Sequence, residues 1–441
     1  MEPKSLIYAE LLPNIRQISL AISLSSPSSQ TSTRVTITAD GEEVQLQHHG
    51  DIETLKLPAK AALGGAVLPI QKPGATALSW RLPLQQTSPA SPLASRQGEA
   101  TDGRVSPWSA TDLQTGSGVS CRRCGTVLVK NDAITVWKDL PSENWAEMME
   151  FWHCHKPDNK DDHSHAHAAR DHVASSTSPS NGHMEKADES SLAARGYGAS
   201  SIISAQEGVG FVDLTALLFA ESNCFAVTFS RSAYECGSTN REDLMSSNIP
   251  ASQSLNIFCS SCHSQIGFFN FRTAAVTLLK WQISCKSASG AAPGISECLA
   301  ATLVSTISRS GSSKSLLTPI SGTVATSKGA AANTTDDTVV HIWVLNSNIV
   351  YSSSGSAAAP TAVAAEVKAA QAGTPAIKLL YRLIPHEEAD RMLEIVTCDA
   401  QEINLPAEAL GRIEKLLDGS NLLFPPAERT FKEWKVGVLT R

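Results

Sequence analysis

The sequence predicts a β-rich α+β fold, and three observations carry this prediction. Short segments with an apolar residue at every second position recur along the 441 residues, as in strands with one buried face. Two Cys-x-x-Cys pairs lie far apart in the chain and can close four ligands around one metal ion. Helix-like spacing of apolar residues is confined to a few short segments.

The first 83 residues are typical of an antiparallel β domain. The segment 15–24 alternates with a period of two, and Asp40-Gly41 separates two alternating segments as a hairpin turn would. The predicted strands of this N-terminal β domain, residues 1–83, lie at 7–12, 15–24, 34–39, 43–47, 54–57 and 77–82.

Four stretches rich in Ser, Ala, Gly, Thr, Pro or His interrupt the pattern and indicate linkers or insertions without a packed core of their own. We expect a linker at 84–118, a disordered insertion at about 156–207, an insertion at 286–336 with one short element near 296–308, and an insertion at about 353–375.

The remaining segments predict two further regions. The first is a β region over 119–285, in which ordered structure resumes at 208–220 and strands are expected at 224–229 and 274–283. The second is a C-terminal α+β module over 337–441. In this module we expect a strand at 339–346, a return strand at 348–351, a strand at 376–383, helices at 386–394 and 406–417 with Gly419 as the stop, and a docked apolar end.

The two Cys-x-x-Cys pairs predict a structural zinc site. The first is Cys121 with Cys124, followed directly by Gly125, and the second is Cys259 with Cys262. A turn between the cysteines brings both sulfurs of a pair to one side, so two pairs supply four tetrahedral ligands. Four thiolates leave no open position for a water, so we expect this zinc to be structural rather than catalytic.

A helix-like segment from Asn144 to His155 is the second candidate site. Trp145, Met148, Met149 and Trp152 fall three or four residues apart, and the segment ends in His153, Cys154 and His155. Three interpretations remain open: Cys154 contacts a partner, even reaching a partner's metal ion as a soft ligand; it packs structurally; or it acts as a nucleophile beside the two histidines. The candidate partner-binding residues are Asn144, Trp145, Trp152, His153, Cys154 and His155.

Composition and motifs argue against several classes of protein. The chain holds 43 acidic and 36 basic residues, a net charge of −7, which does not favour a dedicated nucleic-acid binder. No apolar run is long enough to span a membrane, and ten cysteines without a disulfide framework fit a reducing compartment, the cytoplasm or nucleus. No P-loop, dinucleotide fingerprint, HExxH or Ser-His-Asp motif stands out. The remaining cysteines are interpreted as small apolar or loop residues: Cys224, Cys236, Cys285, Cys298 and Cys398.

Several blocks between about residue 120 and the end resemble the HECT-like ubiquitin-conjugating-enzyme-binding proteins. The most specific block begins at Leu140 with Leu-Pro-Ser-Glu-Asn-Trp and continues to the Cys-His at 154–155. The others are the two Cys-x-x-Cys pairs, Ile342-Trp-Val-Leu-Asn346, Lys378-Leu-Leu-Tyr-Arg382 and Trp434-Lys-Val-Gly437.

This resemblance implies two functions. The first is that of a ubiquitin-protein ligase that binds a ubiquitin-conjugating enzyme and promotes ubiquitin transfer. The second is that of a non-enzymatic adaptor or regulator of the zinc-dependent endonuclease of pre-mRNA 3′-end processing, which it would contact through the Trp145–His155 segment. A zinc β-fold that reads a small ligand or degron is a third option. No ligase nucleophile stands out, because Cys398 does not lie in a HECT-type catalytic motif and the C-terminal block is shorter than a HECT domain.

Overall fold

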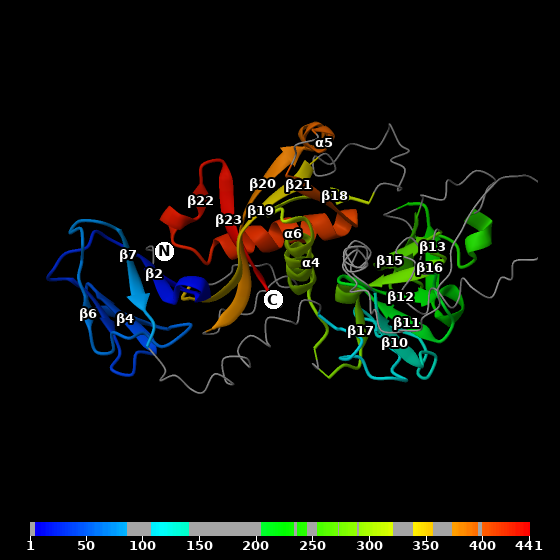
Figure 1. Ribbon diagram of the computed structural model, residues 1–441, viewed down its shortest axis with the longest axis horizontal. Coiled ribbons are helices and arrows are strands. Elements are labelled where there is room, and N and C mark those ends of the chain that lie inside the picture. Colours follow the sequence, from blue (N-terminus) through cyan, green and yellow to red (C-terminus); the bar gives the residue numbers. More distant parts are fainter. Residues whose placement is uncertain are drawn as a thin grey trace, which may run out of the picture. The chain divides into compact units, whose positions relative to one another are not determined.

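The computed structural model describes ten stretches of the chain (Figure 1). They are residues 5–85, 107–140, 204–232, 236–244, 254–271, 273–288, 291–320, 338–355, 373–395 and 399–441. The described elements, up to Asp139 and again from Ala205, belong to one compact unit. The fold is α+β and rich in strands, as the sequence predicts, with three α-helices among the described residues.

A nine-stranded sheet joins the two ends of the chain. Strand β1 pairs antiparallel with β19, so Tyr8 lies opposite Ser353. The path of the sheet runs β22-β23-β20-β19-β1-β2-β7, while β18 pairs with β19 and β21. Its strands are β1 (Leu6–Leu12), β2 (Gln17–Ser23), β7 (Ala77–Pro83), β18 (Lys314–Pro319), β19 (Thr338–Ser353), β20 (Thr374–Pro385), β21 (Ala400–Leu405), β22 (Thr430–Phe431) and β23 (Trp434–Thr440).

A largely buried ion pair links β1 to β20 across the large sheet. The carboxylate of Glu10, which is 5% exposed, accepts hydrogen bonds from Lys378 Nζ at 2.8 Å and from the Tyr8 hydroxyl at 3.0 Å. Burial, followed by the nearby Glu10 charge, raises the pKa of Tyr8 well above its ordinary value. The N-terminal and C-terminal strands therefore share polar as well as apolar contacts.

Strand β19 corrects one prediction. The expected return strand at 348–351 does not exist, because β19 continues as one strand to Ser353. Its register against β20 shifts on both sides of Asn346, where the side-chain oxygen accepts a hydrogen bond from Asn348 N at 2.9 Å. The chain therefore has a register irregularity within β19 at the position where a turn was predicted.

The N-terminal strands outside the large sheet form a four-stranded sheet in the order β5-β4-β3-β6. The predicted hairpin at Asp40-Gly41 is confirmed: Gly41 adopts φ +73°, and a Cβ there would lie 2.4 Å from Ala61 O. Apolar side chains of this sheet pack against those of β1, β2 and β7 in one core. The strands are β3 (Thr33–Ile37), β4 (Glu43–His48), β5 (Asp51–Lys56) and β6 (Val67–Leu68).

Two further sheets carry the cysteine pairs. A seven-stranded sheet runs β10-β11-β12-β16-β15-β14-β13, and a three-stranded sheet runs β17-β8-β9. One buried core lies between them and includes Cys121 and Cys259. The strands are β8 (Val119–Cys121), β9 (Val127–Val129), β10 (Val136–Asp139), β11 (Val209–Val212), β12 (Ala216–Ala220), β13 (Val227–Ser230), β14 (Ser254–Cys259), β15 (Gln265–Asn270), β16 (Ala275–Leu279) and β17 (Ile283–Cys285).

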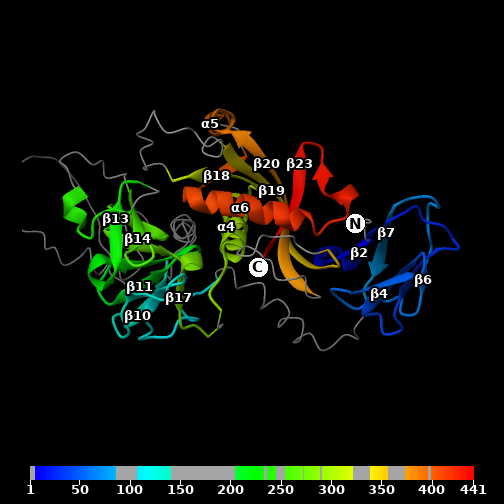
Figure 2. The same ribbon diagram turned by 180° about the vertical axis from the view of Figure 1, so that it is seen from behind.

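Helices α4 (Ile295–Ser310) and α6 (Ala407–Asn421) pack together on one face of the large sheet (Figure 2). Helix α5 (His386–Glu394) packs against Val339 and Ile384, whereas Val340 faces α4 and α6, as the alternation of side chains along a strand requires. Gly419 does not end α6, which continues for two more residues.

Helix α4 also corrects the expected insertion at 286–336. The short element predicted near 296–308 is confirmed as α4, but α4 and β18 are both parts of the core. The small residues that suggested low complexity, among them Ala300 and Ala301, are buried against the sheet. Small side chains here permit close packing of a helix rather than disorder.

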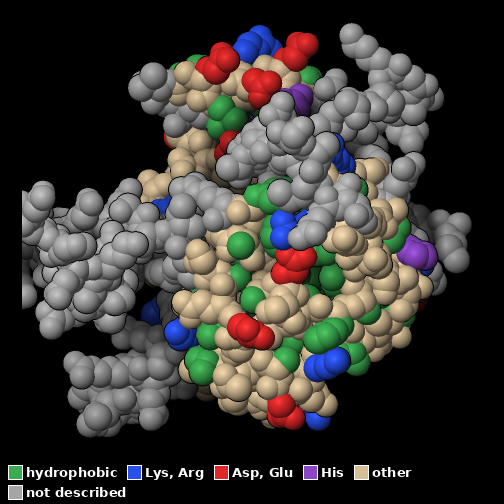
Figure 3. Space-filling model, turned by 90° about the vertical axis from the view of Figure 1, so that its right-hand side faces the viewer, with side chains coloured by type: hydrophobic (Ala, Val, Ile, Leu, Met, Phe, Trp, Pro, Cys, Tyr) green, Lys and Arg blue, Asp and Glu red, His purple; other side chains and the backbone are tan. Residues whose placement is uncertain are grey.

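None of the helices that the structure describes combines the length and apolar character needed to cross a membrane. On the face shown in Figure 3, acidic and basic side chains of the described residues are interspersed with apolar ones rather than gathered by sign.

Candidate metal centre

The two Cys-x-x-Cys pairs adopt the same backbone conformation, which we call the first knuckle (121–126) and the second knuckle (259–264). In the first, Gly125 N donates to Cys121 O at 2.9 Å and Cys121 N donates to Thr126 O at 2.8 Å. In the second, His263 N donates to Cys259 O at 2.9 Å and Cys259 N donates to Ser264 O at 2.9 Å. The four-residue turn of each pair is therefore closed by the same two hydrogen bonds.

A hydroxyl supports the second cysteine of each knuckle. Cys124 Sγ lies 3.2 Å from Thr126 Oγ1, and Cys262 Sγ lies 3.1 Å from Ser264 Oγ. Hydrogen bonds of this kind orient a metal-binding thiolate. The match extends to burial, because the first cysteine of each pair is buried and the second lies nearer the surface.

The four sulfur atoms form one cluster. Cys121 Sγ lies 3.6 Å from Cys262 Sγ, Cys124 Sγ lies 3.6 Å from Cys259 Sγ, and all four lie within 4.8 Å of one another. A tetrahedral zinc with Zn–S bonds of about 2.3 Å would separate its sulfurs by about 3.8 Å. The donor set and spacing therefore fit a closed four-thiolate metal site, and the predicted clustering of these cysteines is confirmed.

The pKa of a thiol in the first knuckle depends on how deeply it is buried. Burial raises the pKa of the Cys121 thiol to about 12, whereas hydrogen bonds from Thr126 lower the pKa of the Cys124 thiol to about 6. Metal-binding cysteines must be deprotonated, so a cation is the partner that would compensate the buried thiolates.

Arginines connect the first knuckle to its surroundings. Arg122 donates through Nη1 to Pro293 O at 3.0 Å and to Trp281 O at 3.4 Å, just before α4 begins. Arg123 donates to Ser264 Oγ of the second knuckle at 3.2 Å. The metal centre is thereby tied both across its own two halves and to the start of α4.

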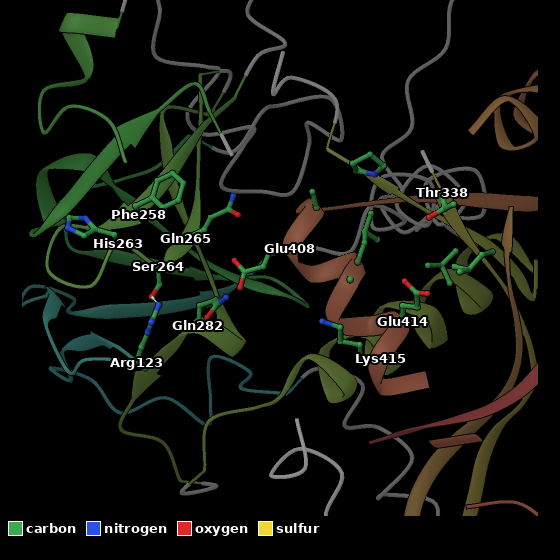
Figure 4. Close-up of a pocket in the computed structure, with 16 residues that line it drawn as sticks. Arg123, Phe258, His263, Ser264, Gln265, Gln282, Thr338, Glu408, Glu414 and Lys415 are labelled. Atoms are coloured by element: carbon green, nitrogen blue, oxygen red, sulfur yellow. Dashed lines mark hydrogen bonds between the residues drawn. The ribbon is translucent and has the colours of Figure 1, made fainter. Parts of the chain in front are cut away.

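A groove of about 610 Å³, lined by both polar and apolar residues, lies beside the second knuckle (Figure 4). Arg123, His263, Ser264 and Gln265 line one wall, and the α6 segment 407–415 lines the other. Figure 4 shows Glu408 pointing from α6 toward Gln265 and Gln282. Gln265 is buried and donates to Asn256 Oδ1 at 2.7 Å.

One contact near the metal centre was not predicted from the sequence. Cys236 Sγ lies 3.2 Å from His263 Nδ1 and 2.9 Å from Thr228 Oγ1. The sequence indicates only a loop cysteine at 236, because its partners come from two other segments and no short motif links them. The contact could have been predicted only if residues 236–238 had been placed at the edge of a strand.

The second candidate site falls in a part of the chain that the structure does not describe. Asn144, Trp145, Trp152, His153, Cys154 and His155 lie outside the described residues. The interpretations of Cys154 as a partner contact, a structural residue or a nucleophile all stay predictions.

Comparisons with known proteins give one match over nearly the whole chain. A family model described as HECT-like ubiquitin-conjugating enzyme (E2)-binding matches residues 10–436. An uncharacterized protein of Saccharomyces cerevisiae is 42% identical over 65 residues, which is 14% of this chain and 18% of that protein. An uncharacterized protein of Schizosaccharomyces pombe is 43% identical over 53 residues, 11% of this chain and 15% of that protein. The matched stretches thus span less than a fifth of either relative. No solved structure gives a significant match.

Proposed function

The chain belongs to the HECT-like ubiquitin-conjugating-enzyme (E2)-binding family, and from this premise we propose that it binds an E2 and promotes ubiquitin transfer from it. The observation that carries the proposal is the extent of the family match. It begins within β1, runs through both knuckles and ends within β23. The family match therefore includes the strands that join the two ends of the chain as well as the metal centre.

The metal in this proposal is zinc, held by Cys121, Cys124, Cys259 and Cys262. Four thiolates satisfy a tetrahedral zinc completely, so it supplies folding energy and no open coordination position. Its contribution is to pin the β8–β9 turn to the β14–β15 turn. The hydrogen bond from Arg122 to Pro293 O then links the first knuckle to the residues before α4.

Binding to purified E2 enzymes tests the proposal. The full-length, zinc-loaded chain is immobilised, and a panel of E2s is passed over it in free form and charged with ubiquitin. We expect saturable binding to at least one E2 and faster discharge of its ubiquitin when the chain is present. A folded, zinc-loaded chain that binds no member of a broad panel would contradict the proposal.

The alternative, an adaptor of the pre-mRNA 3′-end processing endonuclease that uses the Trp145–His155 segment, rests on the sequence resemblance alone. No described residue adds support to it. Capture of that endonuclease by wild type and not by Cys154→Ala, with E2 binding absent from both, would favour this alternative. A location in cytoplasm and nucleus is likewise proposed only from the cysteine usage of the sequence.

A further inference from the structure

The groove beside the second knuckle has two walls of opposite charge. The wall formed by the two knuckles and their neighbours contains Arg123 and no acidic residue. The α6 wall contains Glu408, Glu414 and Lys415, so its net charge is negative. Figure 4 shows Arg123 on the side of the knuckles, and Glu414 and Lys415 on the side of α6. A ligand that lies between these walls therefore meets a positive charge on one side and a negative one on the other.

The third side of the groove belongs to the large sheet and is uncharged. Its lining residues are Pro319, Thr338, Val340 and Leu383. Leu383, on β20, is 42% exposed, whereas its neighbours Leu379 and Leu380 on the same strand are buried. Removing the apolar surface of Leu383 from water is favourable. An apolar side chain that enters the groove would supply this burial.

Helix α6 has a glycine where it lines the groove. Gly411 lies in the first half of the helix, is exposed and does not adopt a positive φ. No atom lies within 4 Å of the position that a Cβ would take. Neither the backbone conformation nor the packing within this chain therefore requires glycine, which is a poor helix former. The missing side chain leaves a hollow in the α6 wall that a side chain of another molecule can fill.

The hydrogen-bonding groups along the groove match a peptide backbone. Ser264, Gln265, Gln282 and Thr338 line it, and their uncharged side chains contain both donors and acceptors. Gln265 is 7% exposed, and its amide is held by the hydrogen bond from Nε2 to Asn256 Oδ1. A peptide backbone likewise offers one donor and one acceptor at each residue other than proline. A polyanion is disfavoured, because the acidic α6 wall would repel it.

The size of the groove distinguishes a peptide segment from a whole domain. Its volume of about 610 Å³ lies within the range of about 300–1,000 Å³ that is typical of ligand pockets. A stable interface between two globular proteins instead buries about 800 Å² on each partner. The groove is therefore suited to a few residues of extended chain rather than to the folded body of an E2.

We propose that this groove binds an extended peptide segment of a partner protein other than the E2. An apolar side chain of the segment covers Leu383 and fills the hollow at Gly411. Successive side chains of an extended chain point to opposite sides. An acidic residue of the segment therefore faces Arg123, and a basic residue faces Glu408. This inference goes beyond the proposed function and does not depend on E2 binding.

Selection from a random peptide library tests this inference. Phage that display random dodecapeptides are selected on the zinc-loaded full-length chain, and enriched peptides are synthesised with fluorescein for affinity measurement by fluorescence polarisation. We expect enriched peptides to share a large apolar residue with an acidic and a basic residue close to it. Leu383→Thr should weaken their binding by about tenfold or more, because it removes the exposed apolar contact.

Leu345→Thr is the matched control for this variant. Leu345 is 48% exposed on β19 of the same sheet, but it does not line the groove. Its substitution should leave the affinity at the wild-type value. A second variant, Gly411→Gln, should raise the thermal midpoint, because glutamine is the better helix former, and weaken peptide binding, because it fills the hollow. Opposite changes in stability and affinity separate a lost binding site from a damaged fold.

Two further measurements identify the occupant. A saturating amount of E2 is added to the peptide complex, and the oligomeric state of wild type and Leu383→Thr is measured by analytical ultracentrifugation. Displacement of the peptide by E2, or a wild-type dimer that Leu383→Thr dissociates, would overturn the inference in favour of another occupant. A library without enriched sequences, or equal affinity of wild type and Leu383→Thr, would also overturn it. Peptide binding at the groove in a chain that binds no E2 would support this inference and contradict only the proposed function.

Discussion

The first and second knuckles have the same hydrogen bonds, hydroxyl support and burial order, yet they differ at the residue that follows the second cysteine. The first has Gly125 at φ +75°, where glycine meets no steric cost. The second has His263 at φ +56°, where a side chain is strained. The strained residue is also the one that reaches Cys236 and the groove. The comparison shows that one metal-binding backbone geometry is reached with glycine in the first knuckle and with a strained histidine in the second.

The surroundings of the knuckles differ in the same sense. Arg122 ties the first knuckle to buried backbone before α4. The second knuckle has no such arginine; His263 and Ser264 line the groove, beside Arg123 of the first knuckle. Substitution of a metal ligand should therefore lower the unfolding free energy equally in either knuckle. Substitution of a residue that does not bind the metal should have a different effect in each knuckle.

The largest effect is expected from removing a buried ligand. Cys121→Ser and Cys259→Ser should each lose the metal and lower the unfolding free energy by about 4 kcal/mol or more, because loss of a metal is among the few changes with effects of that size. Denaturant unfolding of both variants, with metal content measured alongside, checks this. A clear difference between the two would break the equivalence of the knuckles.

The buried Lys280 should make the unfolding free energy depend on pH. Lys280 is fully buried and donates to Pro107 O at 2.5 Å and to Trp108 O at 3.3 Å. Burial lowers its pKa from 10.5 to about 8, and this outweighs the nearby groups that favour its charged form, namely Cys298, Asp213, Asp139 and Asp112.

The unfolded chain therefore binds more protons than the folded chain between pH 8 and 10.5. The unfolding free energy of wild type should rise with pH through this window relative to Lys280→Met, by up to about 3 kcal/mol. Urea titrations of both proteins at several pH values measure the difference. A difference that stays constant with pH would show that Lys280 does not titrate there.

The two arginines of the first knuckle should differ in effect. Arg122→Ala removes charged hydrogen bonds to two backbone carbonyls and should cost about 2 kcal/mol. Arg123→Ala removes one exposed bond to Ser264 and should cost less than about 1 kcal/mol. Thermal unfolding of the zinc-loaded proteins compares them. Equal costs would argue against a special link between the first knuckle and the α4 region.

The smallest effects test the residue that distinguishes the knuckles. Gly125→Ala should cost about 1 kcal/mol from backbone strain alone, since no atom lies within 4 Å of the new Cβ. His263→Gly should relieve strain and raise stability by less than about 1 kcal/mol. Urea midpoints of both variants measure this. A loss of stability in His263→Gly would mean that its contact with Cys236 outweighs the strain.

Local patterns predicted the parts of the molecule that local interactions determine. The alternation at 15–24, the Asp40-Gly41 turn and the two cysteine pairs each depend on a few neighbouring residues, and all appear as expected. The return strand at 348–351 failed because Asn346 and Asn348 are typical of turns, while pairing of β19 with both β1 and β20 keeps the chain extended.

Local sequence patterns do not predict contacts between residues that are far apart in the chain. The pairing of β1 with β19 and the ion pair of Glu10 with Lys378 join opposite ends of the chain, and no periodicity signals them. Cys236 was interpreted as a loop residue for the same reason, since its partners Thr228 and His263 meet it only in the folded protein.

Native mass spectrometry tests most directly the central claim that both knuckles hold one ion between them. Wild type is compared with Cys124→Ser and Cys262→Ser, which change the ligand nearer the surface in each knuckle. The account predicts one zinc ion per wild-type chain and none in either variant. Full zinc retention in either variant, or a second ion in wild type that only one of the two substitutions removes, would contradict it.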